Sequence, residues 1–241
     1  MLHKTRGIVL KVTDFGETSV VAKIYTELFG LQGYLINSVR KKNAKVKKNI
    51  LSPLSLVDLI IYHKDRKGLQ RISDIRPNPP LQRIPFDTIK SSIVFFLTEI
   101  LSKSIHEDEC NPSLFEFLFN AIETLDQQEP VNNDFHLFFL IGLSKYLGFY
   151  PQDGSLKERQ YFNLQEGVFQ NSIPAHQHFI EPPLTDLFHE LMKPSFDFSK
   201  TVLMTIPQKR ILTEKLTEYY QLHIDSFYGV QSHKILQEIW G

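Results

Sequence analysis

Cysteine is nearly absent from this chain of 241 residues, which contains a single one, Cys110. One thiol cannot form a disulfide within the chain, and it cannot supply a four-thiolate zinc site. Long apolar runs are also missing, since no stretch approaches the roughly 20 residues that span a bilayer and no apolar signal core follows Met1. The sequence therefore predicts a cytoplasmic protein with no membrane partner, folded around an ordinary hydrophobic core.

Catalytic signatures are missing as well. The chain has no phosphate-binding loop of the Gly-x4-Gly-Lys-Ser/Thr kind, no dinucleotide-binding glycine pattern and no His-Glu-x-x-His. Residues 107–109 are all acidic and would be able to hold magnesium, but such a cluster is more typical of a solvated loop. His106 with Cys110, and His176 with His178, give only weak metal-ligand spacings. We expect no enzyme activity, no cofactor and no bound metal.

The N-terminal third has the pattern of a small β-barrel. In 20–24 and 35–39 every second residue falls on one face, which is the period of a half-buried strand. These stretches belong to three apolar runs, rich in Val, Ile and Tyr, between Thr5 and Lys48. Two further strand-like runs follow at 54–62 and 69–75, so that five short strands precede Pro77. Five strands at this spacing predict a closed Greek-key barrel of the OB type, with an SH3-like barrel or an open meander as alternatives.

Four prolines between residues 77 and 85 mark the end of this pattern. Proline donates no ladder hydrogen bond and fixes its own φ, so the sheet has to stop there. From Asp87 onward the apolar residues recur with the helical spacing i, i+4, i+7. The sequence therefore predicts an α+β protein with a nucleic-acid-binding barrel in residues 1–83 and a mainly helical domain in residues 84–241.

Capping residues delimit several helices in the second domain. Asn111 followed by Pro112 is a helix start, and Gly148 is a helix stop. The predicted helices are 87–101, 112–125, 134–147, 184–193, 207–223 and 232–240. Between the third and fourth lies an irregular insert at about 149–183, with two short strands expected near Tyr161 and Val168.

The formal net charge of the chain is zero, but its charges are distributed unequally on the two sides of the predicted boundary at Arg83. Residues 1–83 hold 16 Lys and Arg against 6 Asp and Glu, a net of +10, and residues 84–241 hold 11 against 21, a net of −10. The densest cationic group is Arg40, Lys41, Lys42, Lys45, Lys47 and Lys48. A lysine-rich solvated surface gives the same pattern, but on a predicted barrel the asymmetry favours binding to nucleic acid.

Short motifs in both ends and in the middle of the chain follow one order. They are Gly7, Val9 and Leu10, Glu17 and Thr18, Thr26, Phe29, Gly30 and Gly33, the cations from Arg40 onward, Leu147 to Pro151, Tyr219 to Ile224, and Ser232. With these residues in this order the chain resembles RecO, a family of bacterial recombination mediators.

The resemblance implies an N-terminal OB domain followed by a helical domain. It also implies a protein that binds single- and double-stranded DNA, anneals complementary strands, and with RecR loads the RecA recombinase on DNA coated by single-strand-binding protein, in the cytoplasm at the nucleoid. Many members carry a four-cysteine zinc module after the motif that ends at Pro151. This chain has no cysteine in residues 152–183, so we expect side-chain packing to hold that segment and the purified protein to contain no zinc.

Two sets of residues are candidates for binding. We expect phosphate contacts from Arg6, Lys11, Lys23, Arg40, Lys41, Lys42, Lys45, Lys47 and Lys48. We expect the acidic, apolar tail of the single-strand-binding protein to dock near Lys103, Phe139 and Lys145.

Three tyrosines on the predicted strands, Tyr25, Tyr34 and Tyr62, are able either to stack on bases or to fill the barrel. Two other functions share the electrostatic pattern: an RNA-binding factor, and a non-enzymatic adaptor whose acidic half docks a basic protein.

Overall fold

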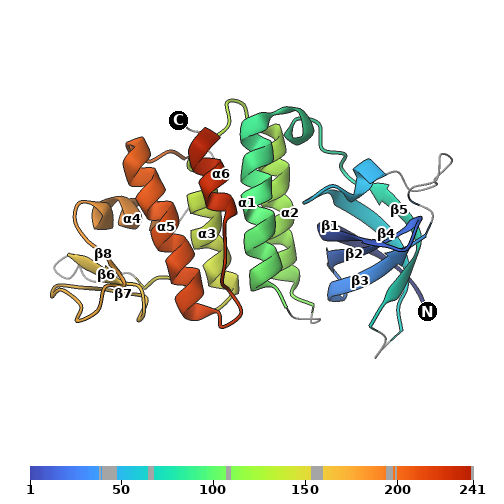
Figure 1. The fold of residues 1–241 in the computed structure, drawn as a ribbon, viewed down its shortest axis with the longest axis horizontal. Helices are drawn as coiled ribbons and strands as arrows, with labels where there is room; N and C mark the ends of the chain where they lie inside the picture. Colours follow the sequence, from blue (N-terminus) through green and yellow to red (C-terminus); the bar gives the residue numbers. More distant parts are fainter. Residues whose placement is uncertain are drawn as a thin grey trace. The chain divides into compact units, whose positions relative to one another are not determined.

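The fold is that of a computed structural model of residues 1–241, drawn in Figure 1. It describes residues 1–37, 39, 48–64, 68–106, 110–152, 160–193, 198 and 200–239, with backbone only for 48, 237 and 239. The chain forms two compact units, Met1–Gln127 and Gln128–Gly241. The first unit extends past the predicted boundary at Arg83, and the division at that residue stays a prediction.

Five strands close into a barrel in the first unit, as the sequence predicts. They are β1 (Leu2–Phe15), β2 (Ser19–Thr26), β3 (Gly30–Ile36), β4 (Leu56–Tyr62) and β5 (Gln70–Pro77), in the order β1-β2-β3-β5-β4 (Figure 1). Strand β4 returns to β1, and a short parallel contact joins β3 to β5. This is the OB arrangement, and closure excludes an open meander.

Alternation along the strands fills the barrel interior with apolar side chains. The interior cluster consists of Val9, Val20, Ala22, Ile24, Tyr34, Ile36, Val39, Leu51, Val57, Leu59, Ile61 and Ile75. Gly7 has to lack a side chain, because a Cβ there would lie 2.7 Å from Cγ2 of Ile24 and 2.9 Å from Cδ1 of Leu59. The other face of each strand is left for solvent or for the helices of the unit.

Two helices complete the first unit, α1 (Thr88–Ser104) and α2 (Pro112–Gln127), after the short 3-10 helices η1 (Lys48–Leu51) and η2 (Ile84–Phe86). Asn111 caps α2 by accepting the backbone N–H of Leu114, which confirms the predicted helix start. The outward ring of Tyr25 stacks on Phe115 of α2. The barrel face at this point is therefore covered by α2.

A single carboxylate attaches the proline-rich connection to α2. The side chain of Asp126, which is 7% exposed, accepts the backbone N–H groups of Gln82, Arg83 and Ile84 at 2.8 to 2.9 Å. Nζ of the buried Lys90 in α1 donates to the carbonyl of the same residue. These bonds tie the connection that follows the barrel to both helices.

In the second unit α3 (Phe135–Tyr146), whose residues 135–144 are all buried, packs against α4 (Leu184–Met192) and α5 (Ile206–His223). Helix α6 (Ser232–Ile239) follows α5. Helix α5 begins at a capping box formed by Thr205 and Gln208, and the predicted stop after α3 is confirmed at Gly148, which has a φ of +87°. The described residues contain no helix long and apolar enough to cross a membrane.

The predicted irregular insert forms a three-stranded sheet, β6 (Tyr161–Asn163), β7 (Val168–Gln170) and β8 (Phe179–Ile180). Its centre is aromatic, because Phe162 contacts Phe169, Phe188 of α4 and Tyr219 of α5 at 4.6 to 5.8 Å between ring centroids. Side-chain packing thus holds the part of the segment in residues 160–183, as expected.

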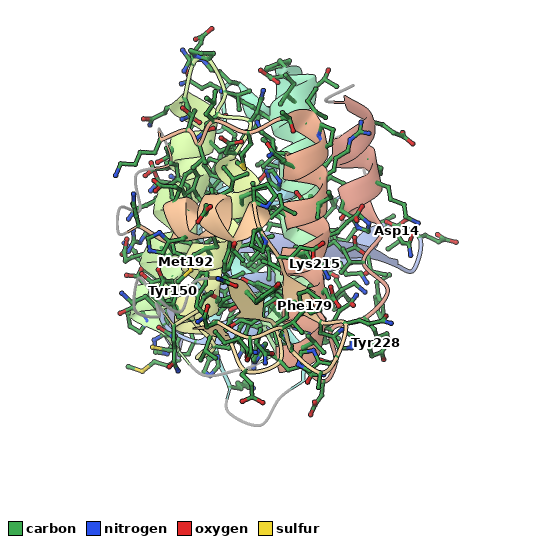
Figure 2. The ribbon with its side chains drawn as sticks, turned by 90° about the vertical axis from the view of Figure 1, so that its left-hand side faces the viewer. Asp14, Tyr150, Phe179, Met192, Lys215 and Tyr228 are labelled. Carbon is green, nitrogen blue, oxygen red and sulfur yellow. The ribbon has the colours of Figure 1, made fainter. Side chains whose placement is uncertain are left out.

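A hydrogen bond outside that sheet joins the chain after α3 to the end of α4. The hydroxyl of Tyr150 donates to the carbonyl of Met192 at 3.2 Å, and both residues are labelled in Figure 2. The second unit is therefore held together by packing and hydrogen bonds between its own elements.

Candidate nucleic-acid interface

Two of the predicted phosphate-binding lysines lie side by side on the outside of the barrel. Lys11 of β1 is the cross-strand partner of Lys23 of β2, and both are exposed. A register shift between Val9 and Lys11 puts Lys11 on the outer face, although both Val9 and Leu10 are buried. The sheet therefore presents two ammonium groups at one place on its surface.

This arrangement is electrostatically unfavourable for the isolated protein. Like charges directly opposite each other in a sheet destabilise it, by about 0.2 to 1 kcal/mol. Among the residues that the structure describes, no carboxylate forms an ion pair with Lys11 or Lys23. An anion bound between the two lysines would remove the repulsion, so the pair has the charge and exposure of a phosphate contact.

Arg6, also predicted to contact phosphate, is engaged in the fold instead. Its Nε and Nη2 donate to the carboxylate of Glu27 at 2.9 and 2.8 Å, and Nη2 also bonds Glu116 of α2. The guanidinium lies 5.1 and 5.0 Å from the ring centroids of Phe115 and Phe119.

The two partners of this ion pair stabilise each other's charged form. The hydrogen bond to Glu27 raises the pKa of Arg6, and the same bond lowers the pKa of Glu27. Arg6 thereby joins β1 to α2, and the structure separates it from Lys11 and Lys23.

Most of the predicted cationic group falls outside the described residues. Arg40, Lys41, Lys42, Lys45 and Lys47 are not among them, and Lys48 is described only as the first residue of η1. Their place in the chain is between the end of β3 at Ile36 and the start of η1, so they belong to the connection from β3 to β4. Their contacts with phosphate stay a prediction.

The structure decides between the two interpretations of the tyrosines. Tyr34 is 0% exposed and fills the barrel, where burial raises the pKa of its hydroxyl. Tyr25 is 2% exposed beneath Phe115. Tyr62 is 50% exposed at the end of β4. Of the three, only Tyr62 has a ring that a nucleic-acid base is able to reach.

In comparison with known proteins, two models of one protein family match nearly the whole chain. The family model described as Recombination protein O N terminal matches residues 1–78, and Recombination protein O C terminal matches residues 85–229. The chain belongs to the RecO family.

Curated relatives from the RecO family are similar in sequence to this chain over their full length. Proteins named DNA repair protein RecO from Flavobacterium psychrophilum, Bacteroides fragilis and Azobacteroides pseudotrichonymphae are 35%, 32% and 31% identical to this chain, with all of both chains covered. The predicted family and the predicted OB barrel are therefore confirmed.

One residue of the RecO barrel's outer face was not predicted as a site. Arg71 of β5 is exposed and is the cross-strand partner of both Leu35 of β3 and Tyr62 of β4. The alternation in 69–75 would have identified Arg71 as an outward residue, because Ile72 beside it points to the core. It brings a cation next to the exposed Tyr62.

The residues predicted to bind the partner tail lie in different units of this RecO protein. Lys103 is in α1 of the first unit, 4.0 Å from Glu99. Lys145 is exposed near the end of α3 in the second unit. Phe139, in the same helix, is 0% exposed and stacks on Phe135. A peptide would therefore reach Phe139 only if the core around α3 opened.

His176 and His178, which have a weak metal-ligand spacing in the sequence, form hydrogen bonds within the protein. The amide of His178 donates to Nδ1 of His176, and Nδ1 of His178 lies 2.5 Å from Oε1 of Glu218. Within the described part of the chain, no group of three or more His, Cys, Asp or Glu residues is arranged to hold a metal ion. The absence of zinc from the purified protein stays a prediction.

Proposed function

We propose that this protein is a DNA-binding recombination mediator that acts without making or breaking covalent bonds. In this proposal it binds single- and double-stranded DNA, anneals complementary strands, and helps to load recombinase on DNA coated by single-strand-binding protein. Membership of the RecO family supports the role in DNA repair. The observation that carries the proposal is the exposed cross-strand pair of Lys11 and Lys23 on the outer face of a closed OB barrel.

The proposed mechanism is electrostatic. Lysines that neutralise phosphates release condensed counterions, which gives an affinity that falls with salt and does not depend on base sequence. Two DNA strands held on one cationic surface repel each other less and meet more often, and this accelerates annealing. We assign most of the DNA affinity to residues 1–83, with Lys11, Lys23 and the group from Arg40 to Lys48 as the phosphate contacts. Arg6 has a structural role in this proposal, because two carboxylates already bind its guanidinium.

RecR and the single-strand-binding protein are the proposed protein partners. The acidic tail of the latter needs an accessible cation beside apolar surface. Lys145 meets the first requirement because it is exposed at the end of α3, and we retain it as the proposed contact. Lys103 is a weaker candidate because it is only half-exposed.

Strand annealing, measured with the full-length protein, tests the proposal. The protein should accelerate annealing of two complementary DNA strands, both bare and coated with single-strand-binding protein. The double variant Lys11→Gln/Lys23→Gln should anneal more slowly, while Lys193→Gln, which removes an exposed lysine in the other unit, should behave as the unaltered protein. Lys145→Glu should anneal bare strands normally and lose the effect on coated strands.

Two outcomes would replace the proposal with one of its alternatives. Annealing of RNA strands in clear preference to DNA would favour the RNA-binding factor. No acceleration with any nucleic acid, together with binding to a basic protein, would favour the adaptor.

A further inference from the structure

An exposed aromatic ring stands among cations on a part of the barrel surface that the phosphate contacts above do not include. Tyr62 is the last residue of β4 and is 50% exposed. Its cross-strand partners are Leu2 of β1, which is 54% exposed, and Arg71 of β5. Because directly opposed residues share a face of the sheet, all three side chains lie on the outside of the barrel.

Three cations lie close to Tyr62 in the register of the sheet or along the chain. Arg71 lies opposite it, Lys4 lies two residues along β1 from Leu2, and Lys64 lies two residues beyond Tyr62; all three are exposed. No described carboxylate forms an ion pair with any of them. A carboxylate on the same outer face, Asp74, lies opposite Ile60 and forms an ion pair with Arg76. Beside Tyr62 itself the exposed charges of the described residues are therefore cationic.

The sheet holds this group in a fixed geometry. A bulge between Ile60 and Ile61 leaves Ser73 without a cross-strand partner, and Arg71 then falls opposite Tyr62 while Ile61 and Ile72 point into the core. The side-chain amide of Gln70 bonds both the N–H and the C=O of Lys64, at 3.0 and 2.9 Å. The imidazole of His63, the residue after Tyr62, stacks on the ring of Phe29 with 4.0 Å between the ring centroids. The end of β4 is therefore ordered on both sides of the exposed tyrosine.

The surface next to the ring is partly apolar. Leu35 of β3 is the partner of Arg71, and Val21 of β2 is the partner of Leu35, both half-buried on the same outer face. On the other side, Lys4 and Ile60 border a separate hollow of about 540 Å³, which Glu27, Asp58 and Asp74 also line and which does not include Tyr62. An aromatic ring with apolar neighbours, edged by cations, is the chemistry that binds single-stranded nucleic acid, in which bases stack on rings and phosphates meet the cations.

We propose that Tyr62, with Arg71, Lys4 and Lys64 around it, is a base-stacking subsite for single-stranded DNA. The proposal rests on the proposed DNA-binding function and adds a distinction to it. Lys11 and Lys23 meet phosphates and therefore serve single and double strands alike, whereas Tyr62 serves only unpaired bases, because the faces of paired bases are already stacked in a duplex. After annealing, the product duplex loses the Tyr62 contact and is held less tightly than the single strands.

The test compares three ligands of equal length: an oligothymidine, a strand of the same number of phosphates without bases, and a duplex. For the unaltered full-length protein, the oligothymidine should bind about 5- to 100-fold tighter than the abasic strand, from one stacked base. Tyr62→Ala should abolish that difference and leave abasic-strand and duplex affinity unchanged. Tyr62→Phe, which retains the ring, should restore it.

A matched control uses Tyr228→Ala, since Tyr228 is 72% exposed in the other unit (Figure 2), and this variant should bind all three ligands normally. The inference is overturned if Tyr62→Ala binds the oligothymidine as tightly as the unaltered protein. It is also overturned if the variant loses affinity equally for the abasic strand, because the loss would then not involve bases. Failure of the unaltered protein to bind any of the three would instead reject the proposed DNA-binding function, and this subsite with it.

Discussion

Lysine and arginine side chains on the barrel of the first unit and on α5 of the second unit differ in their ion-pair partners. On the barrel of the first unit, Lys11, Lys23 and Arg71 are exposed and have no ion-pair partner among the described residues. In the second unit, Nζ of Lys209 lies 2.7 Å from Oδ1 of Asp134, and Lys215 bonds Glu218 at 2.9 Å. Lys209 and Lys215 thus stabilise the second unit, whereas Lys11, Lys23 and Arg71 of the barrel remain available to a ligand. Substitution of these three barrel cations should therefore change DNA affinity, and substitution of the two paired lysines should change stability.

The largest effect is expected from the cationic connection between β3 and η1. If all six cations from Arg40 to Lys48 contact phosphates of a single strand, they contribute about −4 to the slope of log K against log salt concentration, from roughly −0.7 per contact. Replacing all six with neutral residues should flatten the slope by up to that amount, equally for all base sequences. Binding titrations at several salt concentrations measure it.

Stability provides the control for that variant. The melting temperature should hardly change, because the six residues are expected on a surface connection. A change in slope of only about 1 or 2 would mean that a few of the cations touch DNA. An unchanged slope and affinity would remove the whole group from the interface and would weaken the contrast between the units.

Next in size is the loss of the buried ion pair in the second unit. Asp134 is 2% exposed and also accepts the backbone N–H of Val202, so Lys209→Ala leaves a buried carboxylate without its cation. Removing one partner of a buried pair typically costs about 3 kcal/mol or more. Chemical denaturation should show that loss at unchanged DNA affinity. Lys215→Ala, which breaks a more exposed pair, should cost less than about 1 kcal/mol; equal losses in the two variants would contradict the prediction.

A smaller effect is expected in the stability of the second unit at acidic pH. His136 is 0% exposed, and burial, aided by Lys209, lowers its pKa to about 3. In the unfolded chain the same imidazole takes up a proton near pH 6.5, so its contribution to stability is complete above that pH and is lost as the pH falls toward 3. Between pH 7 and pH 5 the free energy of unfolding should fall by about 2 kcal/mol from this residue.

The variant His136→Gln isolates the contribution of that imidazole. It keeps a polar group near Oγ1 of Thr213, which lies 2.8 Å from Nε2 of His136, and it has no proton to gain. Urea unfolding at the two pH values should show a smaller fall for the variant than for the unaltered protein. An equal fall would mean that other groups cause the acid sensitivity.

Much of the fold could be predicted because local chemistry determined it. Period-two alternation located the barrel strands, and Asn111 with Pro112 located the start of α2. Strand β8 was not predicted, because two residues carry no periodicity. The extent of the first unit was not predicted either, because it depends on contacts distant in sequence, such as Tyr25 with Phe115 and Asp126 with the N–H groups of residues 82–84.

The candidate site was predictable only in part, for a related reason. Composition and alternation identify outward lysines such as Lys11 and Lys23, because one strand and its period suffice. They do not show that Arg6 meets Glu116, which is 110 residues away, or that Phe139 has no exposed surface. Whether a cation is available to a ligand depends on its tertiary partners, and sequence pattern does not contain them.

The smallest expected effect compares two cations of the same barrel, Arg6 and Lys23. Arg6 binds two carboxylates and lies over two rings, so Arg6→Gln should lower the free energy of unfolding by about 1 kcal/mol, a modest value because the pair is about one-third exposed. It should hardly alter the salt dependence of DNA binding. Lys23→Gln should do the reverse: it relieves the repulsion with Lys11, leaves stability equal or slightly higher, and reduces the salt slope by roughly 0.7 on a single strand. Denaturation and salt titration of both variants measure all four quantities. If Arg6→Gln changed the salt slope as much as Lys23→Gln, Arg6 would leave its carboxylates for phosphate when DNA binds, and it would belong with the exposed lysines after all.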